Sequence, residues 1–568
     1  MTFASHRQRF LSTLDGWSWL TLTICGLLII PVAVVVSSIF IPLTDIWAHL
    51  FETVLQDYIL NTLQLTLGVL LGTFFIGVGT AWLVTMCRFP GRRLFEWALF
   101  LPMAIPAYVL AYNYTGLLDF AGPVQTLLRD FFGWSRSDYW FPEIRSLGGA
   151  ITMLTLVLYP YVYMLSRSAF LEQSVCVLDV SRSLGCTPHQ AFVRVALPLA
   201  RPSIMGGLAL VLMETLGDFG TVDYFAVDTF TTGIFRIWFG YGEVTAAAQL
   251  SAVLMMFIFI LLWVERASRR KARFFHTTNR YQALPNYQLK GIYSIGAMLA
   301  CLIPATLGFL LPVTIMLSWS VTSGMNELFS AEFITLGRSS MMTALVAAIL
   351  TTFIALIFVY ARRFSQSPIS RLSVRIGTLG YAVPGIVVAV GLIIPMGWLD
   401  NRLDHWAMDN LGVSTGLIFS GTLAILIFAY LVRFLAVACN GLEASLDKIT
   451  PSMDAASRSL GLNSLQTLRR VHLPIMWGSI LNATLLVFVD VMKELPATLV
   501  LRPFNFNTLA VRAYELASDE RLTETGLPAL IIVLLGLIPV IILNHSMTRS
   551  RPGHRAMAKS QALKRVKI

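Results

Sequence analysis

Residues 181–204 read SRSLGCTPHQAFVRVALPLARPSI, and residues 457–480 read SRSLGLNSLQTLRRVHLPIMWGSI. The two stretches share 12 identical residues in 24 positions without a gap. Their separation in the chain, from Ser181 to Ser457, is termed the repeat offset and is close to half of the 568 residues. A match of this length at that separation predicts an internal duplication. The segments MAIPAYVLAY (103–112) and YAVPGIVVAV (381–390) are also similar at nearly the same offset, so the duplication extends beyond the first match.

The composition is typical of a membrane protein, because 56% of the residues are hydrophobic, 13% are charged and the mean hydropathy is +0.70. A helix needs about 20 apolar residues to cross the hydrocarbon core, whereas barrel strands are alternating segments of about ten residues. The long apolar runs predict an all-α polytopic membrane protein with about 12 transmembrane helices in two homologous six-helix halves. The expected spans lie near 17–40, 60–85, 95–119, 148–168, 203–224, 246–264, 292–318, 341–361, 374–397, 414–437, 477–500 and 526–545.

The basic residues indicate how the chain is oriented. The net charge is +11, but the cationic side chains lie between hydrophobic runs rather than on one domain, which argues against nucleic-acid binding. Short cytoplasmic loops are enriched in Lys and Arg. Arg7 and Arg9, together with seven basic residues and no acidic residue in the tail 549–568, therefore predict that both termini lie in the cytoplasm. The same rule places both SRSLG segments in the cytoplasm, and the first apolar run is expected to be an uncleaved span.

Each copy of the duplicated segment is expected to form two short helices around a glycine. In the second copy, Thr450 is an N-cap candidate before Pro451, and Gly461 is suited to a left-handed C-terminal position. Asn463 and Gln466 have the spacing of a capping box at the start of the next helix. The equivalent residues of the first copy are Ser174, Gly185, Thr187 and Gln190. The Leu-Pro pairs at 197–198 and 473–474 are expected to end the motif at the membrane. A simple basic loop is the alternative interpretation.

The spacing G-x9-V-x-L-P, preceded by DVS (179–181) and AAS (455–457), resembles the cytoplasmic EAA loop of binding-protein-dependent ABC transporter permeases of the type I importer class. The resemblance implies that each loop docks into a groove of a separate ATPase subunit. The candidate coupling residues are Asp179, Ser181, Arg182, Ser183, Leu184, Gly185, Pro198, Ala456, Ser457, Arg458, Ser459, Leu460, Gly461 and Pro474. The glutamate that opens the family motif is Asp179 in the first copy and Ala455 in the second, so a role for that carboxylate is in doubt in the second half.

Such permeases usually consist of two subunits with about six spans each, and this chain looks like both subunits fused. We expect a first permease half at 1–265 with a coupling loop near 174–198, and a second half at 291–548 with a coupling loop near 450–474. A cytoplasmic linker at 266–290 joins them, and 549–568 forms a basic cytoplasmic tail. The resemblance implies a location in the bacterial inner membrane. It also implies as partners two ATPase subunits, a periplasmic or lipid-anchored substrate-binding protein, and membrane lipid.

The sequence indicates that any ATP chemistry belongs to a partner. A Walker A loop ends in Gly-Lys-Ser/Thr, and no Gly-Lys dipeptide occurs in this chain. We therefore expect no cofactor in the chain itself, with ATP and Mg bound to the partner ATPase. The six cysteines contain no CxxC spacing, and the eight dispersed histidines contain no HExxH motif, so neither a disulfide framework nor a metalloenzyme is predicted.

The segments DFGTVDYFAVDTFTTGIFRIW (218–238) and DVMKELPATLVLRPFNFNTLAVRAY (490–514) resemble those of fused ferric iron permeases, which implies iron(III) as the substrate. Fused permeases for thiamine and related small solutes share this architecture and remain an alternative. A secondary transporter driven by an ion gradient is a further alternative, because many of these proteins also contain repeats.

Ionisable residues inside a membrane need a partner or a function, because their transfer into lipid costs several kcal/mol. The pathway candidates of the fifth span in each half are Glu214, Asp218, Asp490, Lys493 and Glu494. The repeat offset pairs Glu214 with Asp490 and Asp218 with Glu494, so each half is expected to place two carboxylates on one helical face. An Asp490–Lys493 ion pair, or a position at the water-exposed end of the span, is the alternative. No metal site is firmly assigned. Pro106 and Pro384 are expected to break helices at matching depths.

Overall fold

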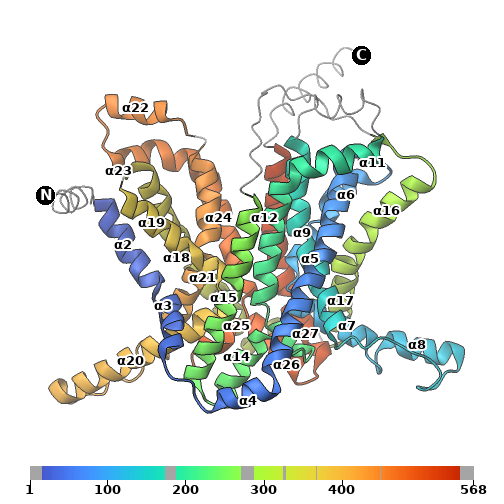
Figure 1. The fold of residues 1–568 in the computed structure, drawn as a ribbon, viewed down its shortest axis with the longest axis horizontal. Helices are drawn as coiled ribbons and strands as arrows, with labels where there is room; N and C mark the ends of the chain where they lie inside the picture. Colours follow the sequence, from blue (N-terminus) through green and yellow to red (C-terminus); the bar gives the residue numbers. More distant parts are fainter. Residues whose placement is uncertain are drawn as a thin grey trace.

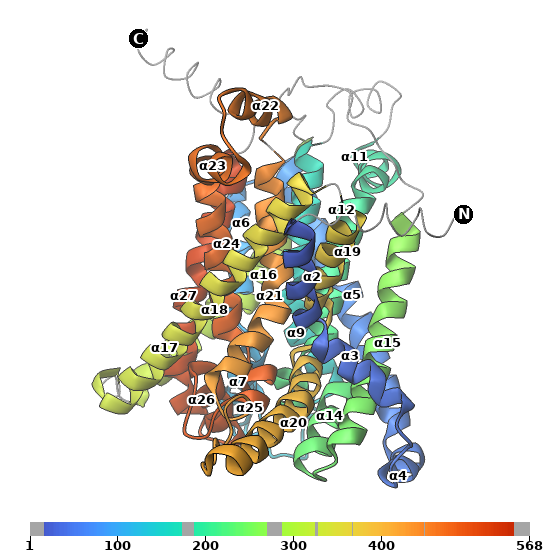
Figure 2. The same ribbon diagram turned by 90° about the vertical axis from the view of Figure 1, so that its left-hand side faces the viewer.

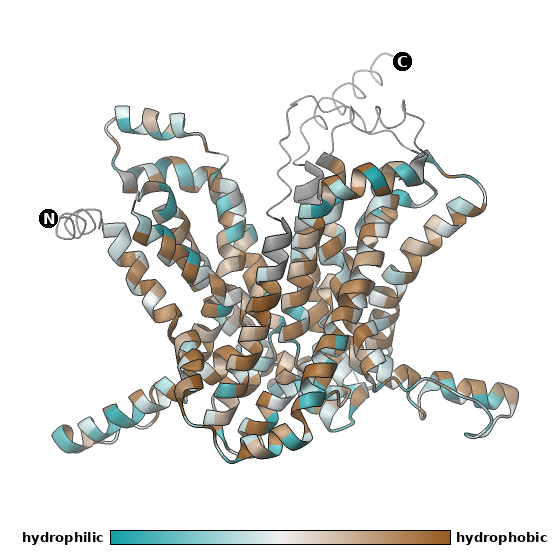
Figure 3. Cartoon of the chain, viewed as in Figure 1, coloured by the Kyte–Doolittle hydropathy of each residue, from teal (hydrophilic) through white to brown (hydrophobic). Residues whose placement is uncertain are grey.

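The computed structural model describes residues 16–172, 187–269, 287–323, 328–365, 367–447 and 449–549. The predicted all-α membrane fold is confirmed. Ten helices within the described residues are long and apolar enough to span a membrane, and two further bent pairs bring the number to as many as 12. Hydrophobic residues cover most of the helices, and hydrophilic residues gather at the far end of α20 (Gly385–Leu411) and on α22 (Pro451–Ser459) (Figure 3).

The elements of the first repeat are α2 (Gly16–Leu28), α3 (Ile30–Ser37), η1 (Ser38–Phe40), α4 (Ile46–Thr53), α5 (Leu55–Met86), β1 (Cys87–Arg88), α6 (Arg92–Ala98), η2 (Leu101–Ala104), α7 (Ala107–Leu118), α8 (Pro123–Phe132), α9 (Leu147–Glu172), α11 (Pro188–Ala191), η3 (Phe192–Ala196), α12 (Leu197–Gly217), α13 (Gly220–Tyr224), α14 (Phe230–Phe239) and α15 (Val244–Arg269). Among these, η3 is a π-helical turn.

The elements of the second repeat are β2 (Tyr287–Gln288), α16 (Ile292–Ala305), η4 (Thr306–Leu310), α17 (Leu311–Thr322), α18 (Ala331–Phe364), α19 (Pro368–Gly377), η6 (Thr378–Ala382), α20, α21 (Leu423–Leu446), α22, α23 (Ser464–Thr467), η7 (Leu468–His472), α24 (Leu473–Lys493), α25 (Pro496–Leu501), α26 (Leu509–Ser518) and α27 (Leu522–Arg549). Both η4 and η7 are π-helical turns.

The duplication is visible in the helix boundaries. The helices α12 and α24 begin and end at positions separated by the repeat offset, and α9 and α21 begin with the same separation. The long helix α5 packs against α9 in the first repeat, and its counterpart α18 packs against α21 in the second. The helices form two groups that diverge towards the side of the molecule that carries α11 and α22 (Figure 1). The two repeats therefore have corresponding helices in the same order.

The first spans of the two repeats are exchanged between the halves. The helices α2 and α3 pack against α19 and α20 of the second repeat, whereas α16 packs against α5 and α6 of the first (Figure 2). The contact between α3 and α20 is so close that a Cβ atom on Gly391 would lie 2.3 Å from the Pro31 carbonyl oxygen. Small residues allow such close helix approach in membranes. The repeats are therefore intertwined.

Prolines break the third span of each half, as predicted. Pro106 precedes α7, and the segments Arg92–Ala104 and Ala107–Phe132 are bent by 95° at this point. Pro384 precedes α20 in the same way. The spans expected at 95–119 and 374–397 are therefore each interrupted at the proline, and in the second of them α19 ends at Gly377 and the chain passes through η6 before α20 begins. Since a proline lacks a backbone N–H and disfavours a helical residue before it, both breaks follow from local chemistry.

Candidate functional site

The fifth spans end earlier than the sequence predicts. The helices α12 and α24 stop at Gly217 and Lys493, and the next residues, Asp218 and Glu494, have extended backbones with ψ angles of 133° and 118°. The prediction that two carboxylates in each half share one helical face is therefore wrong, because the helix does not continue through the second carboxylate. The spans expected at 203–224 and 477–500 are each a long helix, a break and a short helix.

Asp218 and Glu494 bind the start of the short helix that follows each break. The Asp218 Oδ2 atom accepts hydrogen bonds from the backbone N–H groups of Thr221 (3.1 Å) and Val222 (3.2 Å). The Glu494 Oε1 atom accepts a hydrogen bond from the backbone N–H of Ala497 at 3.0 Å. Side-chain oxygens commonly satisfy the first N–H groups of a helix in this way. The two equivalent carboxylates therefore have the same local role at the breaks.

One cavity of about 120 Å³ brings the predicted pathway residues together. Glu214, Asp218, Asp490, Lys493 and Glu494 all line it, and Arg433 from α21 joins them. The remaining lining residues include Pro106 and Tyr108 at the break before α7. Residues from both repeats thus surround one cavity. The helix breaks at Pro106, Asp218 and Glu494 border this cavity, as expected for non-helical segments at membrane depth.

Two cationic side chains in the cavity contact groups that the sequence did not predict. The Lys493 Nζ atom donates a hydrogen bond of 2.9 Å to the Met103 carbonyl oxygen, which joins α24 to the first repeat. The Arg433 guanidinium lies 2.8 Å from the Glu494 carboxylate. Sequence analysis overlooked Arg433, although an arginine within an apolar run is itself a signal of function or pairing. At the equivalent position of the first repeat the residue is Val157.

The second coupling loop has the predicted local geometry. Gly461 has a φ angle of +80°, and the backbone N–H groups of Gly461 and Leu462 donate to the carbonyl oxygens of Arg458 and Ser457. These bonds end α22 in a Schellman motif. The predicted capping box follows, with Asn463 N–H bound to Gln466 Oε1 at 3.0 Å and Gln466 N–H bound to Asn463 Oδ1 at 2.8 Å.

The first coupling loop is described only from Thr187 onward. Its predicted capping box is confirmed, because the backbone N–H of Thr187 donates to Gln190 Oε1 at 3.0 Å and the N–H of Gln190 donates to Thr187 Oγ1 at 3.3 Å. Pro198 is also described. The other candidate residues of this loop lie outside the described residues, namely Ser174, Asp179, Ser181, Arg182, Ser183, Leu184 and Gly185.

The predicted positions of the N-cap and of the Leu-Pro pairs are confirmed, with differences in local detail. Thr450 occupies the N-cap position of α22 and Pro451 lies in the first turn, but the Thr450 side chain makes no capping hydrogen bond and its hydroxyl lies 2.8 Å from that of Ser452. The Leu-Pro pairs lie where each loop passes into a long helix, because Pro198 and Pro474 are in the first turns of α12 and α24, directly after π-helical turns. A widened turn accommodates the missing proline N–H, so each helix continues into the membrane.

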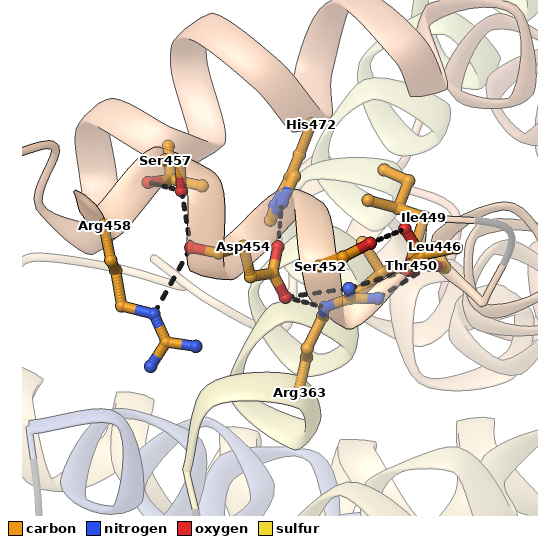
Figure 4. A network of polar contacts seen from close by, with 10 residues as sticks. Arg363, Leu446, Ile449, Thr450, Ser452, Asp454, Ser457, Arg458 and His472 are labelled. Atoms are coloured by element: carbon orange, nitrogen blue, oxygen red, sulfur yellow. Dashed lines mark hydrogen bonds and ion pairs between the residues drawn. The ribbon is translucent and has the colours of Figure 1, made fainter. Parts of the chain in front are cut away.

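A buried polar network holds α22 on the body of the protein (Figure 4). The Arg363 guanidinium at the end of α18 lies 2.8 Å from the Asp454 carboxylate, whose other oxygen lies 2.8 Å from His472 Nε2. The hydroxyl of Ser457, a predicted coupling residue, donates to the Asp454 carbonyl oxygen at 2.9 Å. Sequence analysis did not predict the partners, which lie far apart in the chain. The short helices of the loop and the turn between them also carry exposed apolar side chains, including Met453, Leu460 and Leu465.

The chain matches one protein family twice, over residues 73–274 and 354–552, and this family is described as the inner membrane component of binding-protein-dependent transport systems. The chain belongs to this family. The permease is 28% identical over 540 residues to the Fe(3+)-transport system permease protein FbpB 2 of Haemophilus influenzae, and the match covers 92% of this chain and 97% of that protein.

Other relatives of the permease cover one or both repeats. The ferric transport system permease protein FbpB of Actinobacillus pleuropneumoniae is 23% identical over 477 residues, which are 78% of this chain and 65% of that protein. The molybdenum transport system permease protein ModB of Escherichia coli is 26% identical over 232 residues, which are 39% of this chain and 96% of that protein. The permease is therefore a fused two-half protein, and nearly the whole of ModB corresponds to 39% of it.

Proposed function

We propose that this permease carries iron(III) into the cell by alternating access, driven by separate ATPase subunits and supplied by a substrate-binding protein. A relative whose match covers 92% of this chain is named as an Fe(3+)-transport permease, and the description of the family itself includes dependence on a binding protein. In this proposal both termini and both coupling loops lie in the cytoplasm, which the distribution of basic residues supports.

The single observation that carries the proposal is the acidic cavity between the repeats. Four carboxylates and two cationic groups line it, so the carboxylates outnumber the positive charges. Ferric ion is a hard cation, and hard cations prefer oxygen ligands such as carboxylates. A transport pathway must nevertheless release its ion, so the cavity should bind the ion weakly. We assign Glu214 and Asp490, which the repeat offset pairs and which line the cavity from α12 and α24, as the carboxylates with which a passing ion interacts most directly.

The exposed face of the second coupling loop supports ATPase docking. Large apolar side chains on an exposed surface commonly mark a protein contact. Met453 on α22, Leu465 on α23 and Leu460 between them are exposed, and α22 projects from the helical body (Figure 1). ATP and Mg bind to the partner in this proposal, and closure of the two ATPase subunits moves both loops and, through them, α12 and α24.

Reconstitution into proteoliposomes tests the substrate and the energy source together. We expect uptake of radioactive iron(III) only when the binding protein, the ATPase and ATP are all present. Uptake of thiamine in place of iron would contradict the iron assignment. Uptake that follows an imposed ion gradient without the ATPase would contradict the ATP-driven mechanism and favour a secondary transporter.

Substitution of the two loop glycines tests the coupling role. Gly461 has a left-handed backbone, which a β-branched residue adopts only with strain. We expect the double variant Gly185→Val, Gly461→Val to insert normally but to lose ATPase association or ATP-driven uptake. The matched control is Gly478→Val in α24, where a Cβ atom meets no atom within 4 Å. Normal uptake by the double variant would overturn the assignment of the loops.

A further inference from the structure

The second coupling loop has an ionic connection to the membrane helices for which the first repeat lacks the equivalent residues. Arg363, in the last turn of α18, makes two hydrogen bonds to Asp454 Oδ2, from Nε at 3.0 Å and from Nη2 at 2.8 Å. The same guanidinium donates to the carbonyl oxygens of Leu446 and Ile449, both at 2.8 Å. One side chain therefore joins the ends of α18 and α21 to the coupling helix α22.

Asp454 extends this connection to the helix that enters the membrane after the loop. Its Oδ1 atom lies 2.8 Å from His472 Nε2, and His472 immediately precedes α24. The His472 side chain is 0% exposed and its ring lies near the rings of Tyr360 and Phe364 of α18, with centroids 5.7 and 5.9 Å away. The three residues Arg363, Asp454 and His472, which we term the clamp, thus tie α22 to both α18 and α24.

The clamp is buried, and the charged groups of Arg363 and Asp454 are hydrogen-bonded. The side chain of Arg363 is 16% exposed and that of Asp454 is 9% exposed, so solvent screens their attraction less than it would at an open surface. A buried ion pair of this kind is no proof of stability, but it fixes geometry when its donors and acceptors are paired. Removing one partner leaves a buried charge without its counter-charge.

The first repeat has no charged residue at any of the three clamp positions. The repeat offset aligns Arg363, Asp454 and His472 with Cys87, Leu178 and Ala196, in that order. None of these side chains carries a charge at neutral pH. By contrast, the repeated pentapeptide is identical in the two copies. The sequence difference therefore falls on the residues that support the second loop, whereas the sequence of the pentapeptide is retained in both copies.

We propose that Arg363 is a positioning residue for energy coupling, and that the clamp makes the second coupling loop a rigid extension of α18 and α24. Movement of an ATPase subunit against α22 then displaces these helices directly, and the two loops transmit ATPase closure unequally. This inference rests on the proposed function in one point only, namely that an ATPase subunit is what moves α22. The clamp itself is a property of the chain alone.

The test replaces each clamp residue with its counterpart from the first repeat. The triple variant Arg363→Cys, Asp454→Leu, His472→Ala leaves no member of the ion pair buried without its partner. We expect it to assemble with the ATPase but to transport less iron per ATP hydrolysed, by about tenfold, within the range typical of coupling free energies. The conservative variant Arg363→Lys keeps the ion pair with fewer donors and should show an intermediate ratio.

The neighbouring Arg362 provides a matched control. It forms an ion pair with Glu443 and its side chain is 58% exposed, so Arg362→Ala removes an arginine from the same helix end without touching the clamp. We expect this control to keep the wild-type ratio of transport to ATP hydrolysis. If the triple variant also keeps that ratio, the coupling role of the clamp is overturned. A lower membrane abundance with an unchanged ratio would likewise assign the clamp a structural role only.

Hydrogen exchange of the permease without any partner separates this inference from the proposed function. We expect the backbone amides of α22 to exchange faster in the triple variant than in the wild type and in Arg362→Ala. Equal protection of α22 in all three proteins would overturn the clamp whatever the ATPase does. If α22 exchanges faster in the triple variant, the clamp is supported as a rigid link. If the wild type at the same time does not use ATP hydrolysis for transport, the proposed role of the ATPase is contradicted while the clamp stands.

Discussion

The two repeats of this permease share their backbone plan but differ in their ionic contacts. At the break of the fifth span, Asp218 and Glu494 accept hydrogen bonds from the start of the next helix in the same way. Glu494 also pairs with Arg433, and the residue that corresponds to this arginine in the first repeat is Val157. The two repeats therefore share the capping of the short helix. In the second repeat another helix also supplies a charged partner, Arg433, to the capping carboxylate, and the corresponding residue of the first repeat is uncharged.

The largest effect should come from removing the ion pair between Arg433 and Glu494, which distinguishes the helix break after α24 from the one after α12. Arg433→Met leaves the buried Glu494 carboxylate without its partner, and we expect a loss of about 3–5 kcal/mol in the free energy of unfolding. Denaturation in mixed micelles measures it. Asp218→Asn in the first repeat retains a hydrogen-bond acceptor for the N–H groups of the next helix, so it should cost about 1 kcal/mol.

A compensating substitution sharpens this test. The variant Arg433→Met, Glu494→Gln has no buried charge at this place, and the introduced amide would still offer an oxygen to the backbone N–H of Ala497. We therefore expect the double variant to recover most of the stability that Arg433→Met loses. An Arg433→Met protein as stable as the wild type would contradict the distinction between the two breaks.

A second comparison separates the carboxylates that cap helices from those assigned to the pathway. Glu214→Gln together with Asp490→Asn removes two negative charges from the cavity wall, and we expect iron uptake to fall about tenfold, which corresponds to roughly 1.4 kcal/mol. Assembly with the ATPase should stay intact. Asp218→Asn should affect stability more than uptake. Equal uptake by the wild type and the double variant would remove Glu214 and Asp490 from the pathway.

The smallest effect tests a feature that the repeats share. Thr187→Ala and Asn463→Ala each remove one side-chain acceptor from a capping box, and each should cost about 1 kcal/mol of stability. The two losses, measured by the same denaturation, should be similar, because each side chain accepts the equivalent hydrogen bond in its capping box. A much larger loss for Asn463→Ala would show that the second loop depends on its capping box more than the first does.

Features that depend on neighbouring residues could be predicted from the sequence. The glycine corner at Gly461, both capping boxes and the breaks at Pro106 and Pro384 follow from propensities over a few residues. The repeat itself was visible in the two matching segments that begin at Ser181 and Ser457. The grouping of the pathway residues around one cavity also agrees with the pairing that the repeat offset indicated.

Features that depend on distant contacts could not be predicted in this way. Lys493 binds a carbonyl oxygen 390 residues earlier in the chain, and Arg363 binds an aspartate 91 residues later. Hydrophobic patterns do not encode such partners, nor do they show that α2 and α16 pack on the opposite repeats. The early ends of α12 and α24 were missed because an apolar run continues past Asp218 and Glu494, although Pro496 marks the start of a new helix.

Site-specific cross-linking tests the central claim, that both copies of the duplicated loop contact an ATPase in the cytoplasm. The permease would carry a single cysteine, either Ser183→Cys or Ser459→Cys, in a variant without its own six cysteines. We predict that both probes cross-link to the ATPase and that neither reacts with a membrane-impermeant maleimide added outside the cell. Labelling of either probe from outside, or its failure to cross-link while ATP-driven uptake continues, would contradict the account.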